Sequence, residues 1–110
     1  MVTFDSTAIK QFGLSQYMDN PLVENAIIQV PYTAGSTDIA SGMNMAIDQV
    51  FGQAGDRPNS PNIMIVITDG QDTSDVAGAQ LMAYSKNITV FAVGVGDCKP
   101  YISKKCASWF

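Results

Sequence analysis

The side chains with the clearest chemical potential stand at the end of a continuous apolar segment. Residues 63–67 read Ile-Met-Ile-Val-Ile and are followed directly by Thr68, Asp69 and Gly70. An unbroken apolar run rich in β-branched residues is short for a helix and typical of a strand buried on both faces, as in parallel sheets. A carboxylate at the carboxyl end of such a strand points into the crevice where α/β proteins bind ligands. Asp69 is therefore the first candidate site residue, although an aspartate that only caps the turn before Gly70 would give the same local sequence.

The composition excludes several other chemistries. The 110 residues contain no histidine, so His-based triads and His-ligated metal sites are ruled out. Six basic residues against ten acidic ones give a formal charge of −4, and this balance argues against nucleic acid and anionic membranes as partners. No apolar run reaches the roughly 18 residues that a membrane span needs. A hydrophobic content of 46% suits one small globular domain.

The N-terminal part is expected to form a hairpin and a short helix. Residues 1–4 and a segment within residues 8–14 have the composition of two strands joined by a turn. Asn20 is the expected N-cap of the helix, Pro21 lies in its first turn, and Pro31 ends it. The buried stripe of this helix is expected to consist of apolar residues at helical spacing: Leu22, Val23, Ala26 and Ile27.

The remaining pattern alternates helices and strands. An amphipathic helix is expected to begin within residues 35–38 and to bury one face, made up of Ile39, Met43, Ala46, Ile47, Val50 and Phe51. After the central strand, a helix capped by Thr73, Ser74 or Asp75 is expected to run to about Lys86. A second buried strand is expected over Ile88–Val95 and a last helix from Pro100. This βαβα order predicts a parallel sheet with helices on its faces.

Four segments, in the same order, resemble a von Willebrand factor type A (VWA) domain. They read V-T-F-D-S-T-A at residues 2–8, P-Y-T-A-G-S-T-D-I-A-S-G-M at 31–43, I-V-I-T-D-G-Q at 65–71 and I-T-V-F-A-V-G-V-G-D at 88–97. The resemblance implies a three-layer, doubly wound (Rossmann-like) α/β fold with a mostly parallel sheet. It also implies a metal-ion-dependent adhesion site at the carboxyl edge of the sheet, where a bound Mg²⁺, Mn²⁺ or Ca²⁺ accepts an acidic group from a protein ligand.

The resemblance supplies only part of that metal site. Thr37 matches the family's metal-binding threonine and Asp69 its aspartate, but the D-x-S-x-S segment has no counterpart, because the segments at Asp5 and Asp72 have the wrong spacing. Mg²⁺ demands near-octahedral oxygen ligands. One carboxylate and one hydroxyl leave most positions to water, so we expect metal binding to be weak or absent. The ligand-binding face is expected to hold Ser36, Thr37, Asp69 and Asp72.

The resemblance also implies that two strands of the family are missing. The family's first strand lies in the middle of the sheet and its last strand at one side, so residues 1–110 would form a single partial VWA domain, with Met1 an internal methionine of a longer ancestor. Without the first strand, the hairpin either leaves a slot with unpaired backbone groups or pairs directly with the central strand. Without the last strand, Ile88–Val95 becomes a sheet edge, and exposed apolar edges allow homo-association.

Three residues bear on the cellular compartment. Cys98 and Cys106 would lie about 12 Å apart on one continuous helix, beyond disulfide reach. Pro100, however, places Cys98 before the helix, so a disulfide and partners outside the chain both stay open. Asn87-Ile88-Thr89 fits the N-glycosylation pattern, which matters only in a secreted protein. The resemblance implies an extracellular location, whereas an N-terminus without a signal-peptide pattern favours a cytoplasmic one.

The leading interpretation is a non-enzymatic interaction module of the matrix or cell-adhesion type, with a matrix or adhesion protein as its ligand. One alternative is an intracellular assembly domain of the same family. Another is a Mg²⁺-dependent phosphatase of the haloacid dehalogenase type, in which a strand-end aspartate is the nucleophile. That family requires two aspartates spaced D-x-D, whereas Asp69 and Asp72 lie three positions apart. The residue pattern therefore favours the non-enzymatic interpretation.

Overall fold

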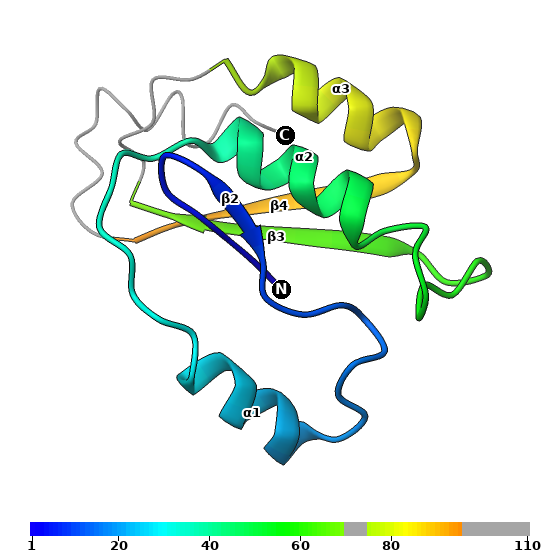
Figure 1. Cartoon of the computed structure of the whole chain (residues 1–110). Coiled ribbons are helices and arrows are strands. Elements are labelled where there is room, and N and C mark those ends of the chain that lie inside the picture. Colours follow the sequence, from blue (N-terminus) through cyan, green and yellow to red (C-terminus); the bar gives the residue numbers. More distant parts are fainter. Residues whose placement is uncertain (70–74, 96–110) are drawn as a thin grey trace.

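The computed structural model describes residues 1–69 and 75–95, which contain four strands and three helices in the order β1, β2, α1, α2, β3, α3, β4 (Figure 1). The strands are β1 (Val2–Phe4), β2 (Ala8–Lys10), β3 (Asn62–Thr68) and β4 (Ile88–Gly94). The helices are α1 (Asn20–Ile28), α2 (Ile39–Gln49) and α3 (Ala77–Ser85). This order agrees with the sequence prediction, and the helix expected from Pro100 lies outside the described residues. No helix in the described part of the chain is long and apolar enough to cross a membrane.

The strands form two separate pairs. β1 and β2 are antiparallel, with Thr3 opposite Ile9, whereas β3 and β4 are parallel, with Met64 opposite Val90. Within residues 1–69 and 75–95, no strand of one pair bonds to a strand of the other. Of the two arrangements expected above, direct pairing of the hairpin with the central strand is therefore not the one that forms.

The core lies between the parallel pair and two helices, α2 and α3. It consists of Met43, Ile47, Met64, Val66, Val76, Ala79, Ala83 and Ile88. The predicted buried face of α2 is confirmed, because Met43, Ile47 and Val50 are buried and the other three predicted residues pack against the core. Figure 1 shows both helices above the same side of β3 and β4.

The other face of the parallel pair is open to solvent. Met64 and Val66 are 7% and 8% exposed, whereas Ile63, Ile65 and Ile67 are 54%, 62% and 61% exposed. Successive side chains of a strand point to opposite faces, so this alternation means that the described helices cover only one face of β3. The prediction of a central strand buried on both faces is wrong for the described chain.

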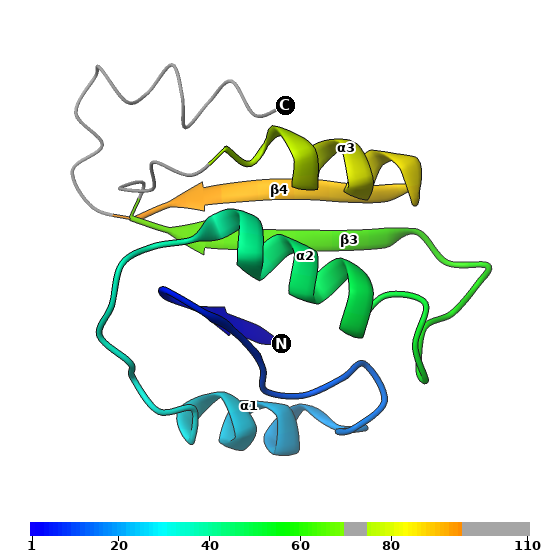
Figure 2. The same cartoon turned by 45° about the horizontal axis from the view of Figure 1, so that its top comes forward.

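Helix α1 differs from its prediction in two ways. Its N-cap is Asp19, whose carboxylate accepts a hydrogen bond from the Leu22 N–H at 2.9 Å, while Asn20 is already the first helical residue. No residue of α1 is buried, and both Leu22 and Ile27 of the expected stripe are about half exposed. In both views α1 stands apart from α2 and α3 (Figures 1 and 2).

Helix α2 fixes the position of the hairpin. At the start of α2, the Asp38 N–H donates to the Asp5 carbonyl at 2.9 Å, and at its end the Lys10 Nζ donates to the Gln49 carbonyl at 3.1 Å. Between these points α2 touches Phe4, because a Cβ at Gly42 would lie 2.6 Å from the Phe4 ring. The hairpin is therefore held by the helix rather than by a neighbouring strand.

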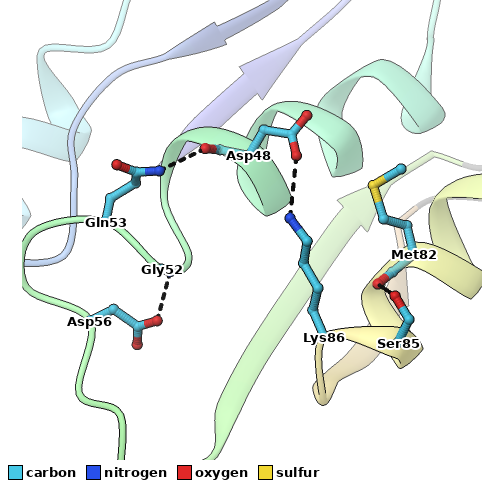
Figure 3. A network of polar contacts seen from close by, with 7 residues as sticks. All are labelled: Asp48, Gly52, Gln53, Asp56, Met82, Ser85 and Lys86. Carbon is cyan, nitrogen blue, oxygen red and sulfur yellow. Dashed lines mark hydrogen bonds and ion pairs between the residues drawn. The ribbon is translucent and has the colours of Figure 1, made fainter.

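Exposed polar contacts lie at the C-terminal ends of α2 and α3 (Figure 3). The Lys86 Nζ lies 3.5 Å from an Asp48 carboxylate oxygen, and the Gln53 amide donates to the Asp48 carbonyl at 3.0 Å. After Lys86 the chain turns into β4 through Asn87, which has a φ of 55°. Asparagine tolerates this left-handed conformation better than most residues, which explains its place in the turn.

Candidate ligand-binding edge

The described candidate residues lie where β3 ends and α2 begins. Asp69 directly follows the last residue of β3 and is exposed, whereas the partly buried Thr37 precedes Asp38, the N-cap of α2. In both views the N-terminal end of α2, the arrowheads of β3 and β4 and the β1–β2 turn lie on the same side of the molecule (Figures 1 and 2). The chain thus brings the segment around Thr37 and the end of β3 to one edge, which we call the ligand-binding edge after its predicted role.

The segment before α2 packs closely on the β1–β2 turn. The Ser36 hydroxyl lies 3.2 Å from the Ser6 hydroxyl, and both are exposed. A Cβ at Gly35 would lie 3.0 Å from the Asp5 Cβ and from the Ser6 Oγ, so a larger residue at this position would push the two segments apart. Ser36, a predicted ligand-binding residue, is therefore held at the edge by a neighbouring hydroxyl.

Asp5 organises this turn. Its carboxylate accepts hydrogen bonds from the Thr7 N–H at 2.8 Å and the Thr7 hydroxyl at 3.3 Å. The backbone hydrogen bond from Thr7 and the Thr33 hydroxyl lower the pKa of Asp5 below its usual value. Sequence reasoning set Asp5 aside because its spacing did not fit a metal motif. The Asp-x-Thr pattern of a local side-chain turn would have revealed its structural role.

Asp38 orients α2 at the same edge. One carboxylate oxygen accepts from the Ser41 N–H at 2.9 Å, and the other accepts from the Ser41 hydroxyl at 2.7 Å. Such a cap satisfies donors of the first helical turn and offsets the positive end of the helix dipole. The carboxylates of Asp5 and Asp38 thus already stabilise local structure at this edge.

The described oxygen donors do not make a closed cage for a divalent cation. Within residues 1–69 and 75–95, no three Asp, Glu or Cys side chains gather in a metal-binding group. Thr37 and Asp69 would contribute one hydroxyl and one carboxylate, far fewer than the six oxygens at about 2.0–2.1 Å that Mg²⁺ prefers. A metal ion held by these two residues would therefore take most of its remaining ligands from water.

The other predicted site residues lie away from this edge or outside the described chain. Asn87 is exposed in the turn between α3 and β4, and its N–H donates to the Tyr84 carbonyl at 3.0 Å. The turn between α3 and β4 lies at the end of the molecule opposite to the ligand-binding edge (Figure 1). Asp72, Cys98 and Cys106 lie outside the described residues, as do two of the three caps expected for α3, Thr73 and Ser74. The third, Asp75, is not the cap: Val76 is the N-cap of α3 and makes no side-chain cap hydrogen bond, while the Asp75 carboxylate accepts from the Ala77 N–H at 3.0 Å.

Residues 1–105 match the von Willebrand factor type A domain family. Human vitrin is 35% identical over 85 residues, an alignment that covers 77% of this chain and 12% of vitrin. Cochlin from Cavia porcellus is 34% identical over 99 residues, covering 86% of this chain and 18% of cochlin. The chain therefore spans less than a fifth of the length of these relatives.

Solved structures of proximal thread matrix protein 1 from the mussel byssus have a similar fold. One crystal form superposes with a TM-score of 0.74 at 32% identity, over 86% of this chain and 24% of that chain. Another structure of the same protein, with a zinc-occupied metal-ion-dependent adhesion site, gives a TM-score of 0.76 at 32% identity. The fold expected from the four sequence segments is thus found in a matrix protein whose adhesion site holds a metal ion.

Proposed function

Because the chain belongs to the von Willebrand factor type A domain family, we propose that it is a non-enzymatic protein-interaction module of the matrix or adhesion type. A relative of the same fold is a matrix protein by name, and neither vitrin nor cochlin is named for an enzymatic activity. The observation that carries the proposal is the common edge at which the start of α2, the β1–β2 turn and the carboxyl end of β3 lie (Figure 2), with the Ser36 and Ser6 hydroxyls in contact there. An extracellular location belongs to the same proposal, and the accessible Asn87 is compatible with it.

In this proposal the ligand is a protein that contacts Ser36, Thr37, Asp69 and Asp72. The exposed carboxylate of Asp69 can accept hydrogen bonds from amide or basic side chains of the ligand, without a bridging ion. A metal ion, where bound, would be held by Thr37 and Asp69 and would supply a positive charge for an acidic group of the ligand. The proposal treats residues 1–110 as one partial domain, in line with the two separate strand pairs.

A binding experiment with single-residue variants tests this function. The chain is immobilised and exposed to soluble fibrillar collagen and to other purified matrix proteins in turn, and binding is followed by surface plasmon resonance. We expect one of these proteins to bind, and Asp69→Asn and Thr37→Ala each to weaken that binding at least tenfold, because each variant removes a polar contact that the ligand satisfies.

Asp48→Asn is the matched control for Asp69→Asn. It removes the same charge from a side chain that is 55% exposed, at the other end of α2, and breaks only a surface ion pair. Its binding should equal that of the unchanged chain. Equal weakening by Asp48→Asn and Asp69→Asn, or no weakening by Asp69→Asn, would contradict a ligand-binding role for the edge.

A further inference from the structure

The segment that joins α3 to β4 has two exposed side chains on either side of a buried one. Asn87 and Thr89 are exposed, whereas Ile88 between them is 6% exposed and belongs to the core. Successive side chains of a strand point to opposite faces, so the burial of Ile88 turns Thr89 outwards. The amide of Asn87 and the hydroxyl of Thr89 are therefore both open to solvent.

Backbone hydrogen bonds close this turn. The Asn87 N–H donates to the Tyr84 carbonyl at 3.0 Å, and the Lys86 N–H donates to the Ala83 carbonyl at 3.1 Å. Asn87 has a φ of 55°, a left-handed conformation in which asparagine is enriched. A group attached to the side-chain nitrogen of Asn87 would leave all of these backbone bonds intact.

An exposed aromatic ring lies at the start of the same turn. Tyr84 is 80% exposed, whereas the preceding Ala83 is fully buried. A turn closed by a hydrogen bond between residues 84 and 87 keeps their Cα atoms within about 7 Å of each other. The face of an aromatic ring is apolar and carries negative charge, which suits the C–H groups on one face of a sugar ring. Tyr84 is therefore within reach of a sugar attached to Asn87.

The sequence confines this chemistry to one position. Asn87-Ile88-Thr89 fits the Asn-x-Ser/Thr pattern of N-glycosylation acceptors. None of the other five asparagines has a serine or threonine two positions later. A glycan added by this route would therefore be single and would be at Asn87.

We propose that Asn87 is an N-glycosylation site, at which the first sugar of the glycan packs on the exposed ring of Tyr84. The donor is an oligosaccharide joined through a diphosphate to a polyisoprenoid lipid. The Asn87 Nδ2 forms a bond to the anomeric carbon of the first sugar, and the bond from that carbon to the diphosphate oxygen breaks. The lipid diphosphate leaves with the electron pair, and the transferase takes the amide proton.

This inference rests on the extracellular location in the proposed function, because only a chain in the secretory pathway meets the lipid-linked donor. The α3–β4 turn lies at the end of the molecule opposite to the ligand-binding edge (Figure 1). A glycan at Asn87 thus leaves that edge free, and the chain can carry the glycan and bind a protein ligand at the same time.

Secretion from a eukaryotic host tests the modification. The full chain is expressed behind a cleavable signal peptide, which sets the location independently of the natural one. We expect one glycan, which peptide N-glycosidase removes while converting Asn87 to aspartate in the mass spectrum. Asn87→Gln and Thr89→Val should each abolish it. Thr89→Val keeps the β-branched shape of the side chain in β4 and removes only the hydroxyl that the pattern requires.

The matched control places the same pattern in another exposed turn. Asn87→Gln combined with Pro61→Thr makes Asn59, which is exposed before β3, the acceptor. A glycan at Asn59 in this variant, with none at Asn87 in the unchanged chain, would overturn the proposal. A glycan at Asn87 without binding of any matrix protein would contradict the proposed function alone, whereas matrix binding by a secreted chain that lacks the glycan would overturn this inference alone.

Nuclear magnetic resonance tests the contact with Tyr84. The glycan is trimmed by an endoglycosidase to its first N-acetylglucosamine, whose methyl resonance the ring should shift upfield. Tyr84→Ala should remove this shift, whereas Tyr32→Ala, at a tyrosine that is 93% exposed before α2, should retain it. Circular dichroism would show that both variants are folded. The absence of a shift in the unchanged chain, or the same shift in folded Tyr84→Ala, would overturn the packing of the sugar on Tyr84.

Discussion

At the scale of single residues, the ligand-binding edge has two of the metal ligands that the family resemblance predicts and lacks the D-x-S-x-S segment. Thr37 and Asp69 stand where the family resemblance predicts a metal-binding hydroxyl and carboxylate, at the start of α2 and the end of β3. The nearby carboxylates of Asp5 and Asp38 accept hydrogen bonds from Thr7 and Ser41. The carboxylates of Asp5 and Asp38 therefore stabilise the β1–β2 turn and the start of α2.

Titration with Mg²⁺ tests whether the two oxygen donors of Thr37 and Asp69 are enough to bind the ion. We expect isothermal calorimetry to show no saturable binding at millimolar Mg²⁺, because solvent would have to fill most of the coordination sphere. Asp69→Asn should give the same featureless titration as the unchanged chain. A saturable signal that Asp69→Asn removes would show that the chain completes the site with donors that we did not identify.

The site was predictable from sequence only where a residue adjoins a strong local pattern. Asp69 follows an apolar strand, and Thr37 adjoins a helix start, so their shared edge followed from topology. The contacts of Asp5 with Asp38 and of Ser6 with Ser36 were not predicted, because they join segments about 30 positions apart in the chain. Periodicity carries no information about such loop-to-loop contacts.

At the scale of elements, α2 is the organiser of the fold. One face of α2 packs on β3 through Met43 and Ile47. At Gly42 the same helix contacts Phe4 of the hairpin. This dual role requires a glycine in the interior of a helix, where glycine is otherwise unfavourable by about 1 kcal/mol. Close packing on Phe4 offsets that cost.

Alanine substitutions at two helical glycines separate packing from helix propensity. Gly42→Ala should lower the free energy of unfolding by about 1–3 kcal/mol, the usual cost of overpacking, because its Cβ would clash with Phe4 at 2.6 Å. Gly78→Ala in α3 meets no atom within 4 Å and should leave stability unchanged or raise it by up to about 1 kcal/mol. Urea unfolding measures both, and equal effects would show that Phe4 does not confine Gly42.

The sequence predicted the helices and strands correctly, but it was wrong about which of their apolar faces are buried. The spacing of apolar residues identified α2 and its buried face. The same kind of spacing in α1 shows that the helix has an apolar face, but it does not show what that face contacts. In the structure Leu22 and Ile27 of this face are about half exposed. Likewise, an apolar run shows that β3 suits burial on both faces, whereas the described helices cover only one.

At the scale of the whole molecule, the described chain is a layer of strands covered on one side. Large apolar residues of both parallel strands are exposed on the uncovered face: Ile63, Ile65, Ile67, Phe91, Val93. Contiguous apolar surface of this kind marks an interaction site or an aggregation liability. Combined with open strand edges, it favours association of the chain with itself, as the sequence predicted.

Sedimentation velocity at increasing protein concentration measures this association. We expect the weight-average mass to rise with concentration, and Ile67→Lys to reduce the rise several-fold, because a charge on the uncovered face opposes its burial. Leu81→Lys introduces the same charge on α3, at a residue that is 70% exposed. A similar reduction in both variants would show that net charge, rather than the uncovered face, controls association.

The uncovered face also has a calorimetric consequence. The increase in heat capacity on unfolding comes mainly from apolar surface that water reaches for the first time. Ile63, Ile65 and Ile67 are more than half hydrated before unfolding begins, so they contribute little to that increase. Per residue, the stability of this chain should therefore vary along a flatter temperature curve than that of a sheet covered by helices on both faces.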